Sequence, residues 1–225
     1  MRTMLYSLTS LLVVSMFLAC ADAPEGERVE AGDAVETPGD QQAAGQTFQV
    51  NTAASKVLWN ASKATGKHNG TLSVGKGTLT VDNGQVTGGE IMLDMQSIVV
   101  EDLQGDQKAK LENHLRSGDF FEADAHPAGT FTITKVEAAS GENAEVTHQI
   151  TGNLTLKGIS KSVTIPANLA VNDNQLTAVT PSFTINRLEW DITYRSGLLG
   201  TAADKVINDQ IGLVIQLEAN AAEEM

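Results

Sequence analysis

The chain has 225 residues, a formal net charge of −13 and a hydrophobic content of 41%, which is enough for a packed core. An acidic protein repels phosphate backbones, so nucleic-acid binding is not expected. Because Cys20 is the single cysteine, no intramolecular disulfide can form, and the fold must depend on its core.

The N-terminal segment is predicted to be a secretory signal. Arg2 precedes an apolar run over residues 8–19, which is shorter than the roughly 20 residues of a membrane helix. The sequence FLAC before residue 21 resembles a bacterial lipobox, with Phe17 where Leu, Val or Ile is usual. The resemblance implies a signal peptide over residues 1–19, lipid attachment at Cys20, and a location in the bacterial cell envelope, lipid-anchored at the periplasmic face or the cell surface. An ordinary secretory signal with an incidental cysteine is the alternative.

Residues 20–46 are predicted to form a disordered acidic linker after the lipidated N-terminus. This stretch is rich in Ala, Gly, Pro and acidic residues, and Val29 and Val35 are its only β-branched aliphatic residues. Such a composition cannot bury enough apolar surface to offset the entropy of the chain. The folded domain is therefore expected over residues 47–225.

Within that domain, strand signals alternate with turn signals such as Asn83-Gly84. The strand-like segments are KVLWNASKA (56–64), GTLSVGKGTLTVDNGQVTGGEIMLDM (70–95), AGTFTITKVEA (128–138), HQITGNLTLKG (148–158), SVTIPANLAV (162–171), SFTINRLEWDITY (182–194) and DQIGLVIQLEAN (209–220). In the last of these, Ile211, Leu213, Ile215 and Leu217 share one parity. A period of two over many strands indicates sheets with one buried and one wet face.

Helix formers interrupt this pattern over residues 107–116, with Gly118 in a plausible C-terminal cap region, and a second short helix is possible around residues 202–206. About eight antiparallel strands with one helical excursion suggest an all-β closed barrel, because closure removes exposed sheet edges. An eight-stranded barrel can either fill its interior or hold one small ligand.

Four stretches carry a resemblance to a known family: HLRSGDFFEADAHP (114–127), GTFTITKV (129–136), GNLTLKGISKSVTIP (152–166) and FTINRLEWDI (183–192). In this order and spacing they resemble the YceI-like family, over about residues 47–219. The resemblance implies an eight-stranded antiparallel lipocalin-like barrel with a short helical insertion. It also implies a binding protein, not an enzyme, for an apolar lipid such as a polyisoprenoid or quinone-like chain, which it would carry, store or shield. No other cofactor is expected, and a homodimer is possible.

The ligand is expected to contact aromatic side chains inside the barrel. Phe120 and Phe121 belong to the family hallmark, and they are predicted to plug or line one barrel end. Simple core packing at a junction between helix and strand is the alternative for this pair. The full set of ligand-binding candidates is Trp59, Phe120, Phe121, Phe131, Phe183 and Trp190.

His114 and Arg187 are the candidates for contact with a ligand head group. The planar donor fork of Arg187 suits an anionic group, but a structural salt bridge with Asp191 or Glu189 is equally compatible with the sequence. Relatives often carry an Asp-Phe-Gly pattern after this arginine. Here Trp190 can take the aromatic place and the glycine is missing, which puts the shape of this end of the cavity in doubt.

Other site motifs are weak. The stretch GTLSVGKGT (70–78) nearly matches a phosphate-binding loop, but Gly77 replaces the hydroxyl residue and the surroundings alternate like strands. Histidines and acids crowd residues 114–126 and could in principle bind a metal, but a helix end and an Ala-His-Pro turn account for them, so no metal is expected. No nucleophile motif appears. A metal-binding or enzymatic accessory protein and a filled-core structural domain remain the alternatives.

Overall fold

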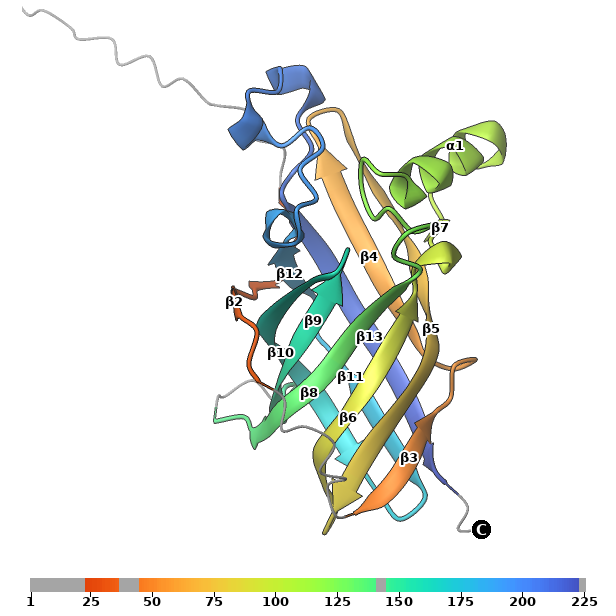
Figure 1. Ribbon diagram of the computed structural model, residues 1–225, viewed down its shortest axis with the longest axis vertical. Helices are drawn as coiled ribbons and strands as arrows, with labels where there is room; N and C mark the ends of the chain where they lie inside the picture. The colour runs from red at the N-terminus through yellow and green to blue at the C-terminus, as the bar shows by residue number, and fades with distance from the viewer. Residues whose placement is uncertain (1–22, 37–44, 141–144, 223–225) are drawn as a thin grey trace, which may run out of the picture.

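The computed structural model describes residues 23–36, 45–140 and 145–222 (Figure 1). The strands are β1 (Glu27–Arg28), β2 (Ala31–Asp33), β3 (Gln46–Val50), β4 (Lys56–Lys63), β5 (Gly66–Asp82), β6 (Gln85–Asp94), β7 (Val99–Val100), β8 (Ala128–Ala138), β9 (His148–Leu156), β10 (Ile159–Val171), β11 (Gln175–Val179), β12 (Phe183–Asn186) and β13 (Gln210–Ala221). The helical segments are α1 (Gly105–Arg116) and the 3-10 turns η1 (Met95–Ser97), η2 (Arg187–Trp190), η3 (Gly197–Leu199) and η4 (Ala203–Lys205).

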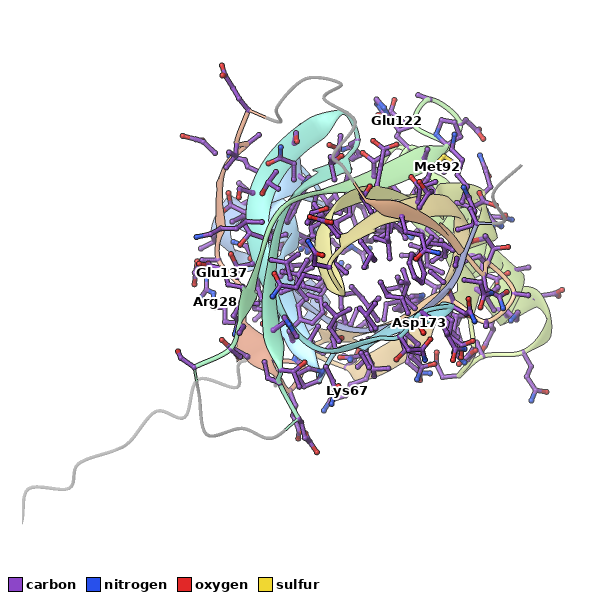
Figure 2. The ribbon with its side chains drawn as sticks, turned by 90° about the horizontal axis from the view of Figure 1, so that it is seen from below. Arg28, Lys67, Met92, Glu122, Glu137 and Asp173 are labelled. Atoms are coloured by element: carbon purple, nitrogen blue, oxygen red, sulfur yellow. The ribbon has the colours of Figure 1, made fainter. Side chains whose placement is uncertain are left out.

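All these strands belong to one sheet that closes on itself. Strands β5, β6, β8, β9 and β10 follow one another as antiparallel neighbours. Next come β11 and β12, which share one position, then β13, and finally β3 and β4, which share the position between β13 and β5. The wall therefore has eight positions, which confirms the predicted barrel, and Figure 2 shows it as a ring around inward-facing side chains.

Tight turns close two of the hairpins. Asn83 and Gly84 have φ values of 50° and 76° between β5 and β6, as the sequence predicted. Lys157 and Gly158 repeat the arrangement between β9 and β10, with φ values of 50° and 74°. Two successive positive φ values give the turn a twist that matches the right-handed twist of the strands on either side.

Helix α1 confirms the predicted helical excursion and begins two residues earlier than expected. The carboxylate of Glu112 accepts a hydrogen bond from the backbone N–H of Val100 in β7 at 2.9 Å, and Lys108 Nζ donates to the carbonyl of Val100 at 2.6 Å. Burial favours the neutral acid, but these partners hold the pKa of Glu112 below its usual value. The helix is thus tied to one end of the barrel. The second predicted helical stretch is the 3-10 turn η4.

The expected disorder of the acidic linker is wrong for residues 23–36. Strand β1 pairs in parallel with β12, and β2 pairs antiparallel with β10. In this region β10 and β12 do not pair with each other, so the N-terminal segment occupies the gap between them. It completes the wall there and is part of the fold; the rest of the linker, residues 20–22 and 37–44, lies outside the described residues.

Side-chain contacts explain why so polar a segment is held. Val29 is only 6% exposed and belongs to the barrel core, and its N–H donates to the carbonyl of Thr184 at 2.8 Å. The buried amide of Asn153 accepts from the N–H of Val35 at 2.9 Å and donates to the carbonyl of Val35 at 2.7 Å. Gly26 packs so tightly on Ser182 that a Cβ would lie 2.6 Å from its carbonyl oxygen.

The interior contains two apolar clusters, one toward each end of the barrel. Figure 1 shows the two ends, with α1 and β7 at one and β3 at the other. The end that carries α1, β7 and η2 is called the helix end, and the opposite end is called the β3 end. The buried members of the helix-end cluster are Val29, Val57, Leu72, Met95, Ile98, Phe120, Ala123, Leu154, Leu156, Val163, Ile165, Phe183, Ile185, Trp190 and Ile192. Those of the β3-end cluster are Phe48, Leu79, Val81, Val86, Ile133, Leu176, Leu217 and Ala219.

Candidate ligand-binding chamber

A cavity of about 180 Å³, called the helix-end chamber, lies inside the helix-end half of the barrel. Side chains from β4, β5, β6, β8, β9, β10, β12 and β13 surround it. Helix α1 contributes Leu115, and the segment after it contributes Phe120 and Phe121. Among the described residues of the lining, Arg187 is the one that carries a charge, and all the others are apolar. Such a space can accommodate an apolar molecule, and it offers very few hydrogen-bond partners to a polar one.

All six aromatic residues predicted to contact a ligand line this one chamber. They are Trp59, Phe120, Phe121, Phe131, Phe183 and Trp190. The four alternating residues of β13, from Ile211 to Leu217, also line it, so the parity inferred from hydrophobicity gives the correct inward face. Their contact with a ligand stays a prediction.

The adjacent Phe120 and Phe121 both face the chamber because they lie in a turn rather than in a strand. After α1 ends, the N–H of Phe121 donates back to the carbonyl of Leu115 at 3.1 Å, and the N–H of Phe120 donates to that of Ser117 at 3.1 Å. Glu122 then adopts a positive φ of 49°, which turns the chain toward β8. Phe120 is buried in the core and Phe121 is half-buried, so the two expected roles, core packing and chamber lining, coincide.

The two tryptophans present apolar ring faces because their indole N–H groups are already satisfied. Trp59 Nε1 donates to the carbonyl of Thr71 at 3.3 Å, and Trp190 Nε1 donates to the carbonyl of Leu154 at 3.0 Å. Trp190 is fully buried, whereas Trp59 is half-buried. The buried indole of Trp190 therefore needs no further polar partner, and its match to the aromatic place of the family pattern stays a prediction.

Arg187 forms a salt bridge, but the partners expected from the sequence are wrong. Its Nη2 lies 2.8 Å from Asp209 Oδ1, and neither Asp191 nor Glu189 is its partner. The side chain is buried, and burial lowers the pKa of the guanidinium from its ordinary value while Asp209 opposes that change. Arginine nevertheless keeps its charge in proteins.

Most donors of this guanidinium are already used. It also donates to three backbone carbonyls, those of Asn208, Ile192 and Ile207. These contacts fasten η2 to the start of β13 at one edge of the chamber. The arrangement favours a structural role for Arg187. Contact with a ligand head group stays a prediction, and it would have to use the N–H groups of the guanidinium that the protein itself does not use.

His114 lies next to the chamber and does not line it. Its Nε2 is 2.8 Å from Asp119 Oδ2, and its ring meets the edges of Phe120 and Tyr194 at centroid distances of 5.0 Å and 4.9 Å. Through Phe120 it fixes one side of the chamber. Its assignment to a head group remains untested.

Sequence reasoning missed several parts of the site. Ala61, Leu115, Ile192 and Ile207 line the chamber, and Asp209 holds Arg187. Ile192 and Ile207 come from irregular segments, where no alternating pattern marks the inward side. Asp209 directly precedes β13 and is separated from Arg187 by η2 and the following loops, so only the closed barrel brings the two together.

A smaller cavity of about 60 Å³ lies in the β3-end half.

Within residues 23–36, 45–140 and 145–222, no group of three or more His, Cys, Asp or Glu side chains is placed to hold a metal ion. In the same described ranges, no helix is long and apolar enough to cross a bilayer.

Comparison with known proteins identifies relatives of the fold. BcnA from Burkholderia cenocepacia superimposes with a TM-score of 0.57 and 21% identity, covering 75% of this chain and 98% of BcnA. A polyisoprenoid-binding domain from Saccharophagus degradans superimposes with a TM-score of 0.56 and 14% identity, covering 79% of this chain and 99% of that domain. At these identities the likeness supports the fold alone.

Sequence matches to curated relatives are closer but shorter. Protein YceI from Shigella flexneri is 33% identical over 100 residues, which is 44% of this chain and 48% of that protein. A UPF0312 protein from Pseudomonas aeruginosa is 49% identical over 61 residues, 27% of this chain and 29% of that protein. The matches thus span less than half of these relatives. The family model of the YceI-like domain matches residues 48–219, most of the chain, and the protein therefore belongs to the YceI-like family.

Proposed function

We propose that this protein binds one long apolar lipid of the prenyl type inside the helix-end chamber. The observation that carries the proposal is the lining of that chamber, in which a single charged side chain, itself tied to Asp209, stands among apolar ones. The name of the polyisoprenoid-binding domain from Saccharophagus degradans, which shares the fold, points to the same ligand class. An isoprenoid chain has the branched apolar surface that such a lining accommodates.

The physical basis of binding is removal of apolar surface from water. Each buried CH₂ contributes about 0.8 kcal/mol before the cost of immobilising the chain is subtracted. Strand pairing closes the barrel wall all the way round, so little ordering of the wall has to accompany binding. Preorganisation of this kind favours affinity.

Binding is favoured over catalysis by the same lining. An enzyme site is expected to bring polar groups together in a pocket and to shift their pKa values. In the described residues, the one titratable group that lines this chamber is Arg187, and most of its donors are used by the protein. The chamber can therefore hold and shield a lipid.

We further propose that the protein acts in the bacterial cell envelope, anchored by lipid on Cys20. The chain from Cys20 to β1 can span at most about 25 Å, because a residue extends about 3.3–3.6 Å. A barrel held so close to its anchor would exchange ligand with the same membrane. Incorporation of labelled palmitate into the wild type, and none into Cys20→Ala, is the expected result. No label in the wild type, or equal label in both, would overturn this part of the proposal.

The test of ligand binding is mass spectrometry of an organic extract of the purified full chain. A stoichiometric long-chain lipid is expected from the wild type. Leu213→Trp should fill the chamber and remove the lipid, whereas the exposed Leu198→Trp should keep it, provided that circular dichroism shows both variants folded. An empty wild-type extract, together with no uptake of added prenyl alcohol, would overturn the proposal.

A further inference from the structure

The helix-end chamber and the smaller β3-end cavity, called here the β3-end chamber, are neighbours along the barrel axis. They measure about 180 Å³ and 60 Å³ and have five lining residues in common, which are Ile91, Phe131, Ile165, Ile215 and Leu217. These residues come from β6, β8, β10 and β13, so the shared level runs round the wall. The two chambers thus adjoin at this level and make up one apolar column.

Two of the shared residues lie on opposite sides of the barrel wall. Phe131 lies on β8 and Ile215 on β13, and in the ring of eight positions these strands are four positions apart on either side. Both side chains pack against the helix-end cluster and also against the β3-end cluster. Together they lie at the boundary between the two chambers, and this pair is called here the constriction.

The neighbouring wall fixes the position of the Phe131 ring. Gly152 on β9 lies under the ring, and a Cβ on that residue would stand 2.5 Å from Phe131 Cζ and 2.7 Å from Cε2. Any larger residue would push the ring from its place. The glycine therefore provides the space in which Phe131 lies at the shared level of the column.

We infer that the constriction of Phe131 and Ile215 sets the length of the apolar chain that the barrel holds, an inference that rests on the proposed lipid binding. An apolar cavity of about 150 Å³ holds one benzene-sized molecule, so the helix-end chamber, at about 180 Å³, takes on the order of one to two isoprene units. That is close to the length of geraniol. A longer chain must pass between Phe131 and Ile215 to reach the β3-end chamber.

The test is the binding of geraniol, farnesol, geranylgeraniol and solanesol to the full chain. Wild-type affinity is expected to be nearly reached with geraniol and to level off for the longer alcohols. Phe131→Ala opens the constriction, so affinity should keep rising to farnesol, with a gain over geraniol of about tenfold or more. Phe131→Leu, which keeps an apolar side chain and protects against loss of folding, should give a smaller gain in the same direction.

A matched control enlarges the helix-end chamber without opening the constriction. Leu156 lines this chamber alone, so Leu156→Ala should change affinity and leave the order of the four alcohols unchanged. If folded Phe131→Ala and Phe131→Leu keep the wild-type length preference, the inference fails while the proposed function stands. If the wild type binds none of the alcohols, the proposed function fails as well.

Discussion

The two ends of the barrel share the same alternation of inward and outward side chains along their strands, but they differ in how much space is left inside. At the β3 end, Phe48, Leu176 and Ala219 have no exposed surface, and little space remains between them. At the helix end, Phe183 and Trp190 are equally buried, but Trp59 and Phe121 are only half-buried and line the larger chamber. One strand pattern can thus build a filled core and a container, depending on whether side chains from opposite strands meet across the axis.

At the helix end, hydrogen bonds and a salt bridge hold the wall together in addition to apolar packing. Arg187 joins η2 to β13 through Asp209, Glu112 joins α1 to β7, and Asn153 holds the N-terminal segment against the wall. A hollow barrel loses cross-axis contacts, so its wall must be fixed from outside the chamber. The predictions below test this division between apolar packing and polar ties.

The largest effect is expected at the filled end. Phe48→Ala removes a fully buried ring and should lower the free energy of unfolding by about 3–5 kcal/mol. Phe121→Ala, at the hollow end, should cost less than about half as much and should mainly weaken ligand binding. Chemical denaturation of both variants measures the contrast, and equal losses of stability would contradict it.

The next effect concerns the tie at Arg187. Asp209→Asn leaves the buried guanidinium without its carboxylate, and a loss of about 2–3 kcal/mol is expected in thermal or urea unfolding. The double variant Arg187→Met with Asp209→Asn should recover part of this loss, since it leaves no unpaired buried charge. If the double variant is less stable than Asp209→Asn, the guanidinium supports the end by its hydrogen bonds to carbonyls instead.

A smaller and local effect is expected for the N-terminal segment. Asn153→Ala removes both hydrogen bonds to Val35 and should cost about 1–2 kcal/mol. Amide exchange in residues 23–36 should accelerate, while exchange in β13 should not change. Ser182→Ala, which removes one bond to the carbonyl of Glu25, is the milder control. Unchanged exchange in Asn153→Ala would mean that pairing with β10 and β12 alone holds the segment.

The smallest effect is the dependence of α1 on pH. Because the pKa of Glu112 is lower in the folded protein than its ordinary value of 4.5, the ionised carboxylate stabilises the contact with β7 above that pH. The stabilisation is lost as the pH falls through the lowered pKa. The amide resonance of Val100 should move in that acid range. Glu112→Gln should abolish this titration, and an unchanged titration would contradict the assignment.

Much of this arrangement could be predicted from the sequence because it follows from local pattern. Period-two alternation identified the inward parity of β13, and Asn83-Gly84 marked the turn after β5. The aromatic residues of the chamber could be predicted because a large apolar side chain at an inward position of a barrel must lie in the barrel interior.

The rest depends on contacts that only the closed wall creates. The stretch around Val29 is rich in charged residues and resembles a linker. It forms the short strands β1 and β2 because β10 and β12 leave a gap for them. The partner of Arg187 was sought among its sequence neighbours, but β13 brings Asp209 to it. Whether the interior is filled or hollow depends on the combined volume of side chains that face each other across the barrel axis. This volume cannot be obtained from the order of residues along the chain, because the facing residues come from strands far apart in the sequence.

The most direct test of the account is an NMR measurement of contacts between bound farnesol and the methyl groups of the full chain. We expect nuclear Overhauser effects from farnesol to helix-end residues such as Leu156, Ile185 and Leu213. None is expected to Leu176 in the β3-end cluster. Contacts confined to the β3 end or to the outer surface would contradict the claim that one end of this barrel is the container and the other is the core.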